Sequence, residues 1–327
     1  MQLKHYLAHR KMRDNHSYAN LETYLSILSP CLFSTEMNTS KRLLILAGGA
    51  SSRMKKNTEN LAGVDSHLVD QANSLTKGMI GVGQGGKSLI DYLLFNAHLA
   101  GFTNVLLVLH PEDTVTQEYY EHLYKTNRAW NMTFQFARQF IAADRHKPAG
   151  TADALYQALY QNPDWQKGRF VVCNSDNLYS STALNLLWDC IYPNALISYE
   201  RDAMKFPQER INAFAIIKED ANSFLEEIIE KPTDDDTNVI LRSQGRLGVS
   251  MNLFVMDAET MFPILEATPF HPVRNEKELP TAVSMYGQKF GRGFFTIPLS
   301  EHVPDLTSKT DLKVVQDYLS EHYKVTI

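Results

Sequence analysis

The chain has 327 residues, of which 44% are hydrophobic and 21% are charged, so it is long enough to bury a sizeable core. A formal charge of −5 gives no globally basic surface, and no apolar stretch approaches the roughly 20 residues that span a bilayer; both features argue against general nucleic-acid binding and membrane insertion. The three cysteines, Cys31, Cys173 and Cys190, form no paired pattern, which favours a reducing, cytoplasmic setting.

Residues 1–40 are polar, and Leu21, Tyr24, Leu25 and Leu28 within them have a spacing compatible with a helix. We expect a helical extension there. A single domain is expected over residues 41–327, because no linker or internal repeat interrupts that part of the chain.

The domain begins with the stretch LLILAGGASSRMKK, residues 43–56. Its first four residues form a continuous apolar run, which is typical of a parallel strand covered on both faces. Gly48 and Gly49 then leave room for a ligand close to the backbone, and Arg53 supplies positive charge beyond them. The pattern indicates a phosphate-binding loop, with a tight turn after a core strand as the alternative.

Strand-like and helix-like segments alternate through the rest of the chain, which predicts an α/β sheet built from crossover units. Residues 57–76 lack a sustained apolar period and predict a long surface loop, and the acidic run at 234–236 predicts a solvated loop tip. Strands are expected at 104–109, 133–136, 170–173, 195–199, 211–218, 224–229, 248–255 and 293–298, and helices ending near 99 and at 117–124, 151–160, 258–266, 277–286 and 309–322.

A literal Walker A match runs from Gly81 to Ser88, with Lys87 in the position that contacts the β- and γ-phosphates. A P-loop follows directly on a strand, whereas residues 76–80 include Lys77 and Gly78 and offer at most two apolar residues. A P-loop kinase or NTPase therefore stays as an alternative function.

Two aspartates are candidate metal ligands. Asp176 follows the apolar run at 170–173, so it is expected beyond the carboxyl end of a strand, where open α/β sheets bind ligands. Asp305 also lies between a predicted strand and a predicted helix. Two carboxylates from separate strand ends could hold one Mg²⁺ against nucleotide phosphates. A cap at Asp176 and a turn at Asp305 are the structural alternatives.

Two further segments carry groups suited to phosphates. Lys231 ends a predicted strand in the sequence EKP and would place a fixed cation there, although surface lysines before proline are common. Gly150 and Thr151 open a predicted helix, whose first backbone amides could contact a nucleotide or simply be capped.

Together these motifs resemble the sugar-phosphate nucleotidylyltransferases, the NDP-sugar pyrophosphorylases that make nucleotide sugars, over residues 41–318. LAGGASSRM is similar to the family signature LAGGxGTRL, and Lys77 to the lysine that follows it. GGKSLIDYLL is similar to the segment GGKPLIDY, which also accounts for the Walker A match. Further along, the resemblance rests on PAGTADAL, VVCNSDN, EKP, GVSMNLFVMD and VPDLTSKTDL.

The resemblance implies a three-layer, Rossmann-like (GT-A-like) α/β fold, in which a mixed but mostly parallel sheet is flanked by helices and residues 41–327 form the catalytic domain. It implies Mg²⁺-dependent transfer of a nucleotidyl group from an NTP to a sugar 1-phosphate, with release of pyrophosphate. A cytidylyltransferase acting on another phosphorylated alcohol and a non-catalytic nucleotide-binding relative remain alternatives. The motifs name neither the base nor the sugar, and a homo-oligomer is compatible with them.

The resemblance also assigns roles to residues of this chain. Arg53 and Lys77 would be catalytic by stabilising charge on the triphosphate, and Asp176 and Asp305 would hold the metal. The nucleotide would contact Leu46, Ala47, Gly48, Gly49, Gly150 and Thr151, and the sugar phosphate would contact Asn174, Glu230, Lys231 and Asn252.

Overall fold

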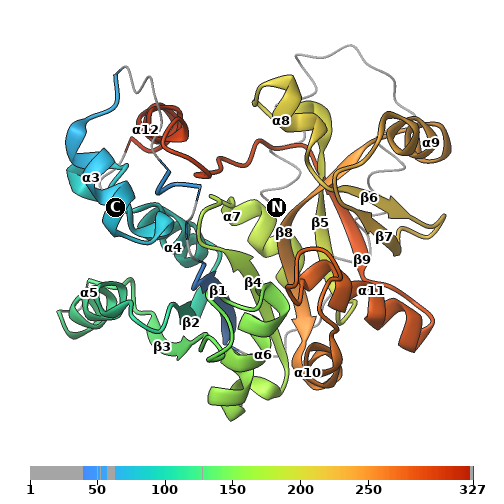
Figure 1. Cartoon of the computed structure of the whole chain (residues 1–327), viewed down its shortest axis with the longest axis horizontal. Coiled ribbons are helices and arrows are strands. Elements are labelled where there is room, and N and C mark those ends of the chain that lie inside the picture. The colour runs from blue at the N-terminus through green and yellow to red at the C-terminus, as the bar shows by residue number, and fades with distance from the viewer. Residues whose placement is uncertain (1–39, 50, 52, 57–62, 127, 325–326) are drawn as a thin grey trace.

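The computed structural model of the chain describes residues 40–49, 51, 53–56, 63–126, 128–324 and 327. The helical extension predicted for residues 1–40 therefore lies almost entirely outside the described residues. Within them, helices pack on both faces of one mixed sheet of nine strands (Figure 1). This confirms the predicted three-layer α/β class.

Four parallel strands form the first half of the sheet: β1 (Lys41–Ala47), β2 (Phe102–Leu109), β3 (Thr133–Arg138) and β4 (Arg169–Asn174). Their order is β3-β2-β1-β4, so β1 lies between two partners. Its residues Leu43, Leu44 and Ile45 are fully buried, as their continuous apolar run predicts. Because the four strands run in the same direction, their carboxyl ends meet at one edge of the sheet.

In the second half of the sheet, β8 (Gly248–Asp257) runs against the first four strands and pairs antiparallel with both β4 and β5 (Ala195–Glu200), so β5 runs in the same direction as β4. β9 (Phe295–Leu299) pairs parallel with β5. A hairpin of β6 (Ile216–Glu219) and β7 (Leu225–Ile229) joins the first residues of β8. β8 therefore connects the two halves.

Alternation along the strands sends side chains into two cores, one on each face of the sheet. The first core is covered by α3 (Ser66–Ser74), α4 (Leu89–Leu99), α5 (Thr114–Lys125), α7 (Ser181–Trp188) and α12 (Asp311–His322), and the second by α6 (Thr151–Gln161), α10 (Ala258–Ala267) and α11 (Leu279–Phe290). Two more helices, α8 (Gln208–Asn212) and α9 (Asp234–Gln244), lie beside the second half of the sheet (Figure 1). No helix of the described residues is long and apolar enough to cross a membrane.

Three sequence predictions are wrong in detail. The segment 57–76 is not one long loop, because Ser66–Ser74 forms α3, capped by Asp65. The segment 211–218 is not a strand throughout, because α8 covers its start and β6 begins only at Ile216. The acidic run at 234–236 is the first turn of α9, where Thr233 and Asp236 form a capping box and the carboxylates meet the positive end of the helix dipole.

The Walker A match is not a P-loop. None of the described residues from 63 to 80 forms a strand, and the residues just before the match form a 3₁₀ helix, η2 (Lys77–Met79). Within the match, a second short 3₁₀ helix, η3 (Gln84–Gly86), leads to Ser88, which caps α4 in a capping box with Asp91. The P-loop alternative is therefore wrong, because the strand that positions a P-loop is missing.

Candidate active site

The glycine loop follows β1 at the carboxyl edge of the parallel strands. An ideal Cβ on Gly48 would lie 3.3 Å from the carbonyl carbon and oxygen of Leu109 at the end of β2, so a side chain there would press on the neighbouring strand. Around Gly49 the corresponding position is open, with nothing within 4 Å. Leu46 is half-buried and Ala47 is buried. The loop predicted to bind the nucleotide thus lies at the expected edge, with its second glycine facing open space.

Lys77 lies beside Asp176, although 99 residues separate them in the sequence. Its Nζ lies 3.0 Å from Asp176 Oδ2, and the two side chains are only 12% and 24% exposed. Gly78 permits this approach, because an ideal Cβ on it would lie 2.6 Å from Ile90 Cγ1 and 2.7 Å from the carbonyl oxygen of Ser175. A cation and a carboxylate predicted from separate motifs therefore form one ion pair.

Asp305 lies next to Asp176 on a neighbouring segment. Asn177 and Asp305 form an antiparallel bridge, and the amide of Leu306 donates to the carbonyl oxygen of Asp176 at 2.8 Å. Burial raises the pKa of the Asp305 carboxyl, and the negative charge of Asp176 raises it further. The structure therefore brings the two predicted metal ligands close enough to repel each other.

Arg210 of α8 orients Asp305, a contact that sequence reasoning missed. Its Nη2 donates to Asp305 Oδ2 and its Nη1 to Asp311 Oδ1, each at 2.5 Å. Thr307 Oγ1 also donates to Asp305 Oδ2, at 2.7 Å. Because 95 residues separate Arg210 from Asp305, no local pattern signals the pair.

The donor set suits a magnesium ion that is shared with substrate phosphates. Mg²⁺ is usually bound through one or two carboxylates and takes waters and phosphate oxygens as its other ligands. Asp176 and Asp305 supply two carboxylates, and the described residues contain no cluster of three or more His, Cys, Asp or Glu side chains that could hold a metal ion. In the described part of the chain, the two carboxylates therefore fit a magnesium ion whose other ligands are waters and phosphate oxygens better than a magnesium ion bound by protein side chains only.

Gly150 and Thr151 open α6, but a segment from later in the chain uses part of this helix start. Gly150 has a φ of 112°, and an ideal Cβ on it would lie 2.3 Å from the carbonyl oxygen of Lys277. That oxygen accepts from the amide of Ala152 at 3.0 Å, and Thr151 Oγ1 accepts from the amide of Leu279 at 3.0 Å. The Thr151 hydroxyl thus has a structural partner at the start of α11, and the start of α6 is packed against the segment that precedes α11.

Gln139 joins the glycine loop to α6, and sequence reasoning missed it too. It follows β3 directly and its side chain is buried. Its Nε2 donates to the carbonyl oxygen of Gly150 at 2.8 Å and to Asp153 Oδ2 at 2.9 Å, while its Oε1 lies 3.4 Å from an ideal Cβ on Gly48. Its position in the sequence could have indicated a site residue, because Gln139, like Asp176, is a polar residue just beyond the end of a predicted parallel strand.

Asn174 and Asn252 lie where β4 and β8 run side by side. Val172 of β4 pairs with Phe254 of β8, and each asparagine stands two residues further toward the same end of the sheet. Asn174 also pairs in register with Leu46 of β1. Asn174 is therefore next to the strand that carries the glycine loop, and Asn252 lies one strand further along the sheet.

Glu230 and Lys231 form the turn that follows β7. Lys231 has a φ of 50° and Asn252 a φ of 55°, a left-handed conformation that is uncommon outside glycine and often found at functional sites. Glu230 forms an ion pair with Arg274. Lys231 and Arg53 are both exposed, and no hydrogen bond or ion pair of the described residues joins either side chain to Asp176 or Asp305.

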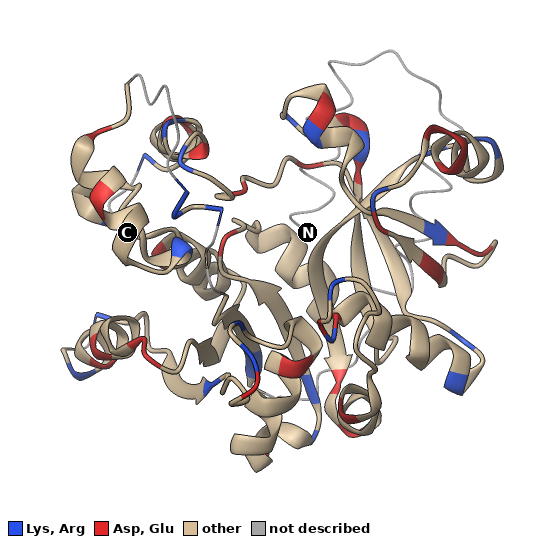
Figure 2. Ribbon diagram, in the orientation of Figure 1, with Lys and Arg blue, Asp and Glu red and all other residues tan. Residues whose placement is uncertain are grey.

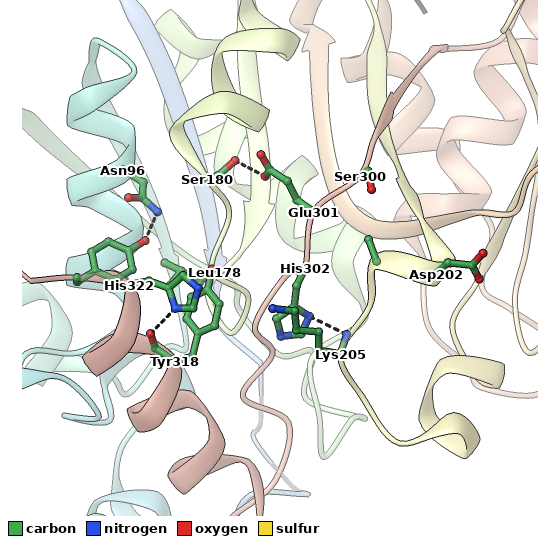
Figure 3. Close-up of a pocket in the computed structure, with 12 residues that line it drawn as sticks. Asn96, Leu178, Ser180, Asp202, Lys205, Ser300, Glu301, His302, Tyr318 and His322 are labelled. Atoms are coloured by element: carbon green, nitrogen blue, oxygen red, sulfur yellow. Dashed lines mark hydrogen bonds between the residues drawn. The ribbon is translucent and has the colours of Figure 1, made fainter. Parts of the chain in front are cut away.

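A separate cavity of about 510 Å³ lies between α12 and the segment after β9, and none of the predicted site residues lines it (Figure 3). Ser180 and Glu301 point toward each other there, and Ser180 Oγ donates to Glu301 Oε2 at 2.6 Å. Burial raises the pKa of Glu301. Burial, together with the positive charge of Lys205, lowers the pKa of His302 to about 4. The cavity is therefore distinct from the candidate active site.

A glycine loop, a lysine–carboxylate pair and a second carboxylate at the carboxyl edge of parallel strands are the arrangement expected of a nucleotide-binding α/β protein. The family model described as "Nucleotidyl transferase" matches residues 42–259, more than half of the chain. The chain therefore belongs to the nucleotidyl transferase family, and the family predicted from its motifs is confirmed.

Glucose-1-phosphate adenylyltransferases of Histophilus somni strains 2336 and 129Pt are each 24% identical to this chain over 234 residues, which cover 68% of it and 48% of the relative. The chain thus spans about half the length of these curated relatives. Its fold is similar to UDP-glucose pyrophosphorylase complexed with UDP-glucose, with a TM-score of 0.63, 15% identity, and coverage of 86% of this chain and 99% of that one. An apo UDP-glucose pyrophosphorylase gives a TM-score of 0.61 at the same identity and coverage.

Proposed function

We propose that the protein transfers a nucleotidyl group from an NTP to a sugar 1-phosphate and releases pyrophosphate. The observation that carries the proposal is the cluster of Lys77, Asp176 and Asp305 beside the glycine loop. It combines a cation suited to a triphosphate with two carboxylates suited to a divalent ion, at the edge where such sheets bind ligands. The names of the curated relatives and structural neighbours support the same substrate class.

The reaction needs positioning and charge neutralisation more than proton transfer. A phosphate oxygen of the sugar phosphate attacks the α-phosphorus of the NTP, and the bond from that phosphorus to the bridging oxygen breaks as pyrophosphate leaves. The attacking phosphate is already ionised at neutral pH, so no general base is required. Lys77, held by Asp176, would meet negative charge on the triphosphate, and Arg53 would add a second cation.

The remaining residues would hold the substrates around this centre. Asp176 and Asp305 would hold Mg²⁺, which neutralises phosphate charge when bound. The backbone of residues 46–49 and 150–151 would contact the nucleotide, with Gln139 fixing the two loops relative to each other. The sugar phosphate would lie toward the second half of the sheet, against Asn174, Glu230, Lys231 and Asn252.

A cytoplasmic location is part of the proposal, because Cys173 and Cys190 are buried free thiols, as is common in a reducing compartment. The extension over residues 1–40, the domain over 41–327 and a homo-oligomer stay predictions. Binding of nucleic acid or membrane is not expected.

The test is a pyrophosphate-release assay over four NTPs, a panel of sugar 1-phosphates and choline phosphate. In the productive pair, Asp176→Asn should lower kcat by about 10³-fold, because it removes the charge that pairs with Lys77 and binds the cation. The control, Asp189→Asn, removes a 51% exposed carboxylate near Lys41 and should change kcat by less than about twofold.

Near wild-type turnover of Asp176→Asn in Mg²⁺ would contradict the proposed site. Pyrophosphate release from an NTP with choline phosphate as the acceptor, but with none of the sugar 1-phosphates, would favour the cytidylyltransferase alternative. If the protein binds an NTP but releases pyrophosphate with no pair of NTP and acceptor phosphate, the result would favour a non-catalytic relative.

A further inference from the structure

Residues 268–278, here called the strap, connect α10 to α11 and contact both predicted substrate regions. Charged residues of both signs follow one another near its end, with Arg274, Glu276, Lys277 and Glu278 close together in the sequence (Figure 2). The motifs predicted none of them as site residues. The contacts of the strap reach the start of α6 on one side and the turn after β7 on the other.

At α6 the strap is bound through its backbone. The amide of Lys277 donates to the carbonyl oxygen of Ala149 at 2.6 Å, and the carbonyl oxygen of Lys277 accepts from the amide of Ala152 at 3.0 Å. The Thr151 hydroxyl accepts from the first amide of α11. Any side chain at Gly150 would overlap the backbone of Lys277. The strap and the predicted nucleotide-binding helix start are therefore packed as one unit.

At the turn after β7, Arg274 binds two carboxylates. Its Nη1 pairs with Glu230 Oε2, and its Nη2 lies 2.6 Å from Glu278 Oε2. The Glu278 side chain is only 11% exposed; burial raises its pKa, and the nearby charge of Glu230 raises it further. The guanidinium of Arg274 thus offsets the repulsion between two neighbouring carboxylates. Without it, Glu230 would be driven away from the strap.

We propose that Arg274 is a positioning residue for the sugar-phosphate site, and that the strap couples this site to the nucleotide site. The inference rests on the proposed function, since it takes Glu230 and Lys231 as groups that meet the sugar phosphate. The left-handed conformation of Lys231 is unfavourable on its own, so neighbouring contacts must hold the turn. A nucleotide that orders the start of α6 also orders the strap, and the strap holds Glu230. Each substrate therefore strengthens binding of the other.

Arg274→Met tests the positioning role because it removes the guanidinium and keeps most of the aliphatic chain. KM for the sugar 1-phosphate should rise by about tenfold, while the Kd of a non-hydrolysable NTP analogue, measured without sugar 1-phosphate, should change by less than about twofold. Arg274→Lys keeps the charge but not the fork that binds two carboxylates, so it should recover part of the loss. Lys313→Met breaks an exposed ion pair with Asp317 on α12 and, as the matched control, should leave both constants unchanged.

Two further measurements do not depend on turnover. Calorimetry with a non-hydrolysable NTP analogue should show that the analogue tightens sugar 1-phosphate binding by about tenfold in the wild type and not in Arg274→Met. Hydrogen exchange of the amides at 229–233 in the ligand-free protein should be faster in Arg274→Met than in the wild type.

An equal weakening of NTP analogue binding in the absence of sugar 1-phosphate, or unchanged exchange at 229–233, would overturn the positioning role. Equal cooperativity in the two proteins would overturn the coupling. If the wild type turns over no substrate pair, the proposed function fails, and the exchange measurement then decides whether Arg274 holds the turn.

Discussion

Replacing Gly78 by alanine should damage the candidate site by moving Lys77. Gly78 is buried within η2, between Ile90 of α4 and the carbonyl oxygen of Ser175. An ideal Cβ would lie 2.6 and 2.7 Å from these two neighbours, whereas ordinary contacts begin at 3.4 Å. The methyl group must therefore displace η2 by several tenths of an ångström, because Ser175 is fixed between β4 and Asp176.

Two effects set the expected magnitude. Adding a methyl group to a packed site costs about 1–3 kcal/mol, which lowers Tm by about 1.5–4.5 °C in a chain of this size. Displacing η2 also lengthens the 3.0 Å ion pair between Lys77 and Asp176. A misplacement of about 1 Å in a site that works by positioning costs about 100-fold in rate. We expect kcat to fall by about 30–100-fold at a temperature where the variant is fully folded.

The pyrophosphate-release assay at saturating substrates, together with thermal melts, measures both effects. Gly287→Ala is the matched control. Gly287 lies within α11, and a Cβ on it would lie 3.4 Å from Gly293, which is an ordinary contact distance. This variant should leave kcat unchanged and raise the free energy of unfolding by about 0.5–1 kcal/mol. Wild-type kcat and Tm in Gly78→Ala would refute the packing argument. A lower Tm with wild-type kcat would refute the link to Lys77.

Two further predictions concern residues outside this cluster. Lys87 follows η3 in a loop that no strand precedes within residues 63–80, so Lys87→Ala should change kcat by less than about threefold; a loss of 100-fold or more in the same assay would restore the P-loop interpretation. Burial lowers the pKa of His302 from 6.5 to about 4, so the unfolded chain binds a proton at a pH where the folded chain does not. The stability that neutral His302 contributes is therefore present above pH 6.5 and lost as the pH falls toward 4. Urea unfolding should show that the wild type loses about 2 kcal/mol more than His302→Gln between pH 7 and pH 4.5, and parallel losses would contradict the shifted pKa.

The parallel half of the site could be predicted from local sequence. A continuous apolar run marks a strand buried on both faces, and residues just beyond such strands meet at one edge of the sheet. That reasoning alone placed Gly48 and Asp176, whose strands β1 and β4 pair directly. Lys77 was different, because residues 76–80 offer at most two apolar residues and no strand pattern, and only the family resemblance assigned Lys77 to the same site as Asp176.

The parts that could not be predicted depend on contacts between distant segments. Arg210 reaches Asp305 across 95 residues and Arg274 reaches Glu230 across 44, so neither pair leaves a local pattern. The helix α3 was missed because it is polar on average and buries only two residues, Leu68 and Ala72. The start of α9 could have been predicted, because a threonine followed three residues later by a carboxylate is a capping signal. The acidic run was interpreted as a loop tip instead.

The two halves of the sheet position their site residues by different means. Gly48 and Asp176 follow buried strands whose backbone is fixed by hydrogen bonds to the neighbouring strands, so we expect substitutions elsewhere to change their positions little. Lys231 and Asn252 adopt left-handed conformations that cost energy and persist only because neighbouring segments hold them. The turn after β7 contacts the strap through the ion pair of Glu230 with Arg274, so we expect it to respond to changes far from the substrate. We therefore expect phosphate handling to depend on the strand ends, and sugar choice to depend on the strap and the turn it holds.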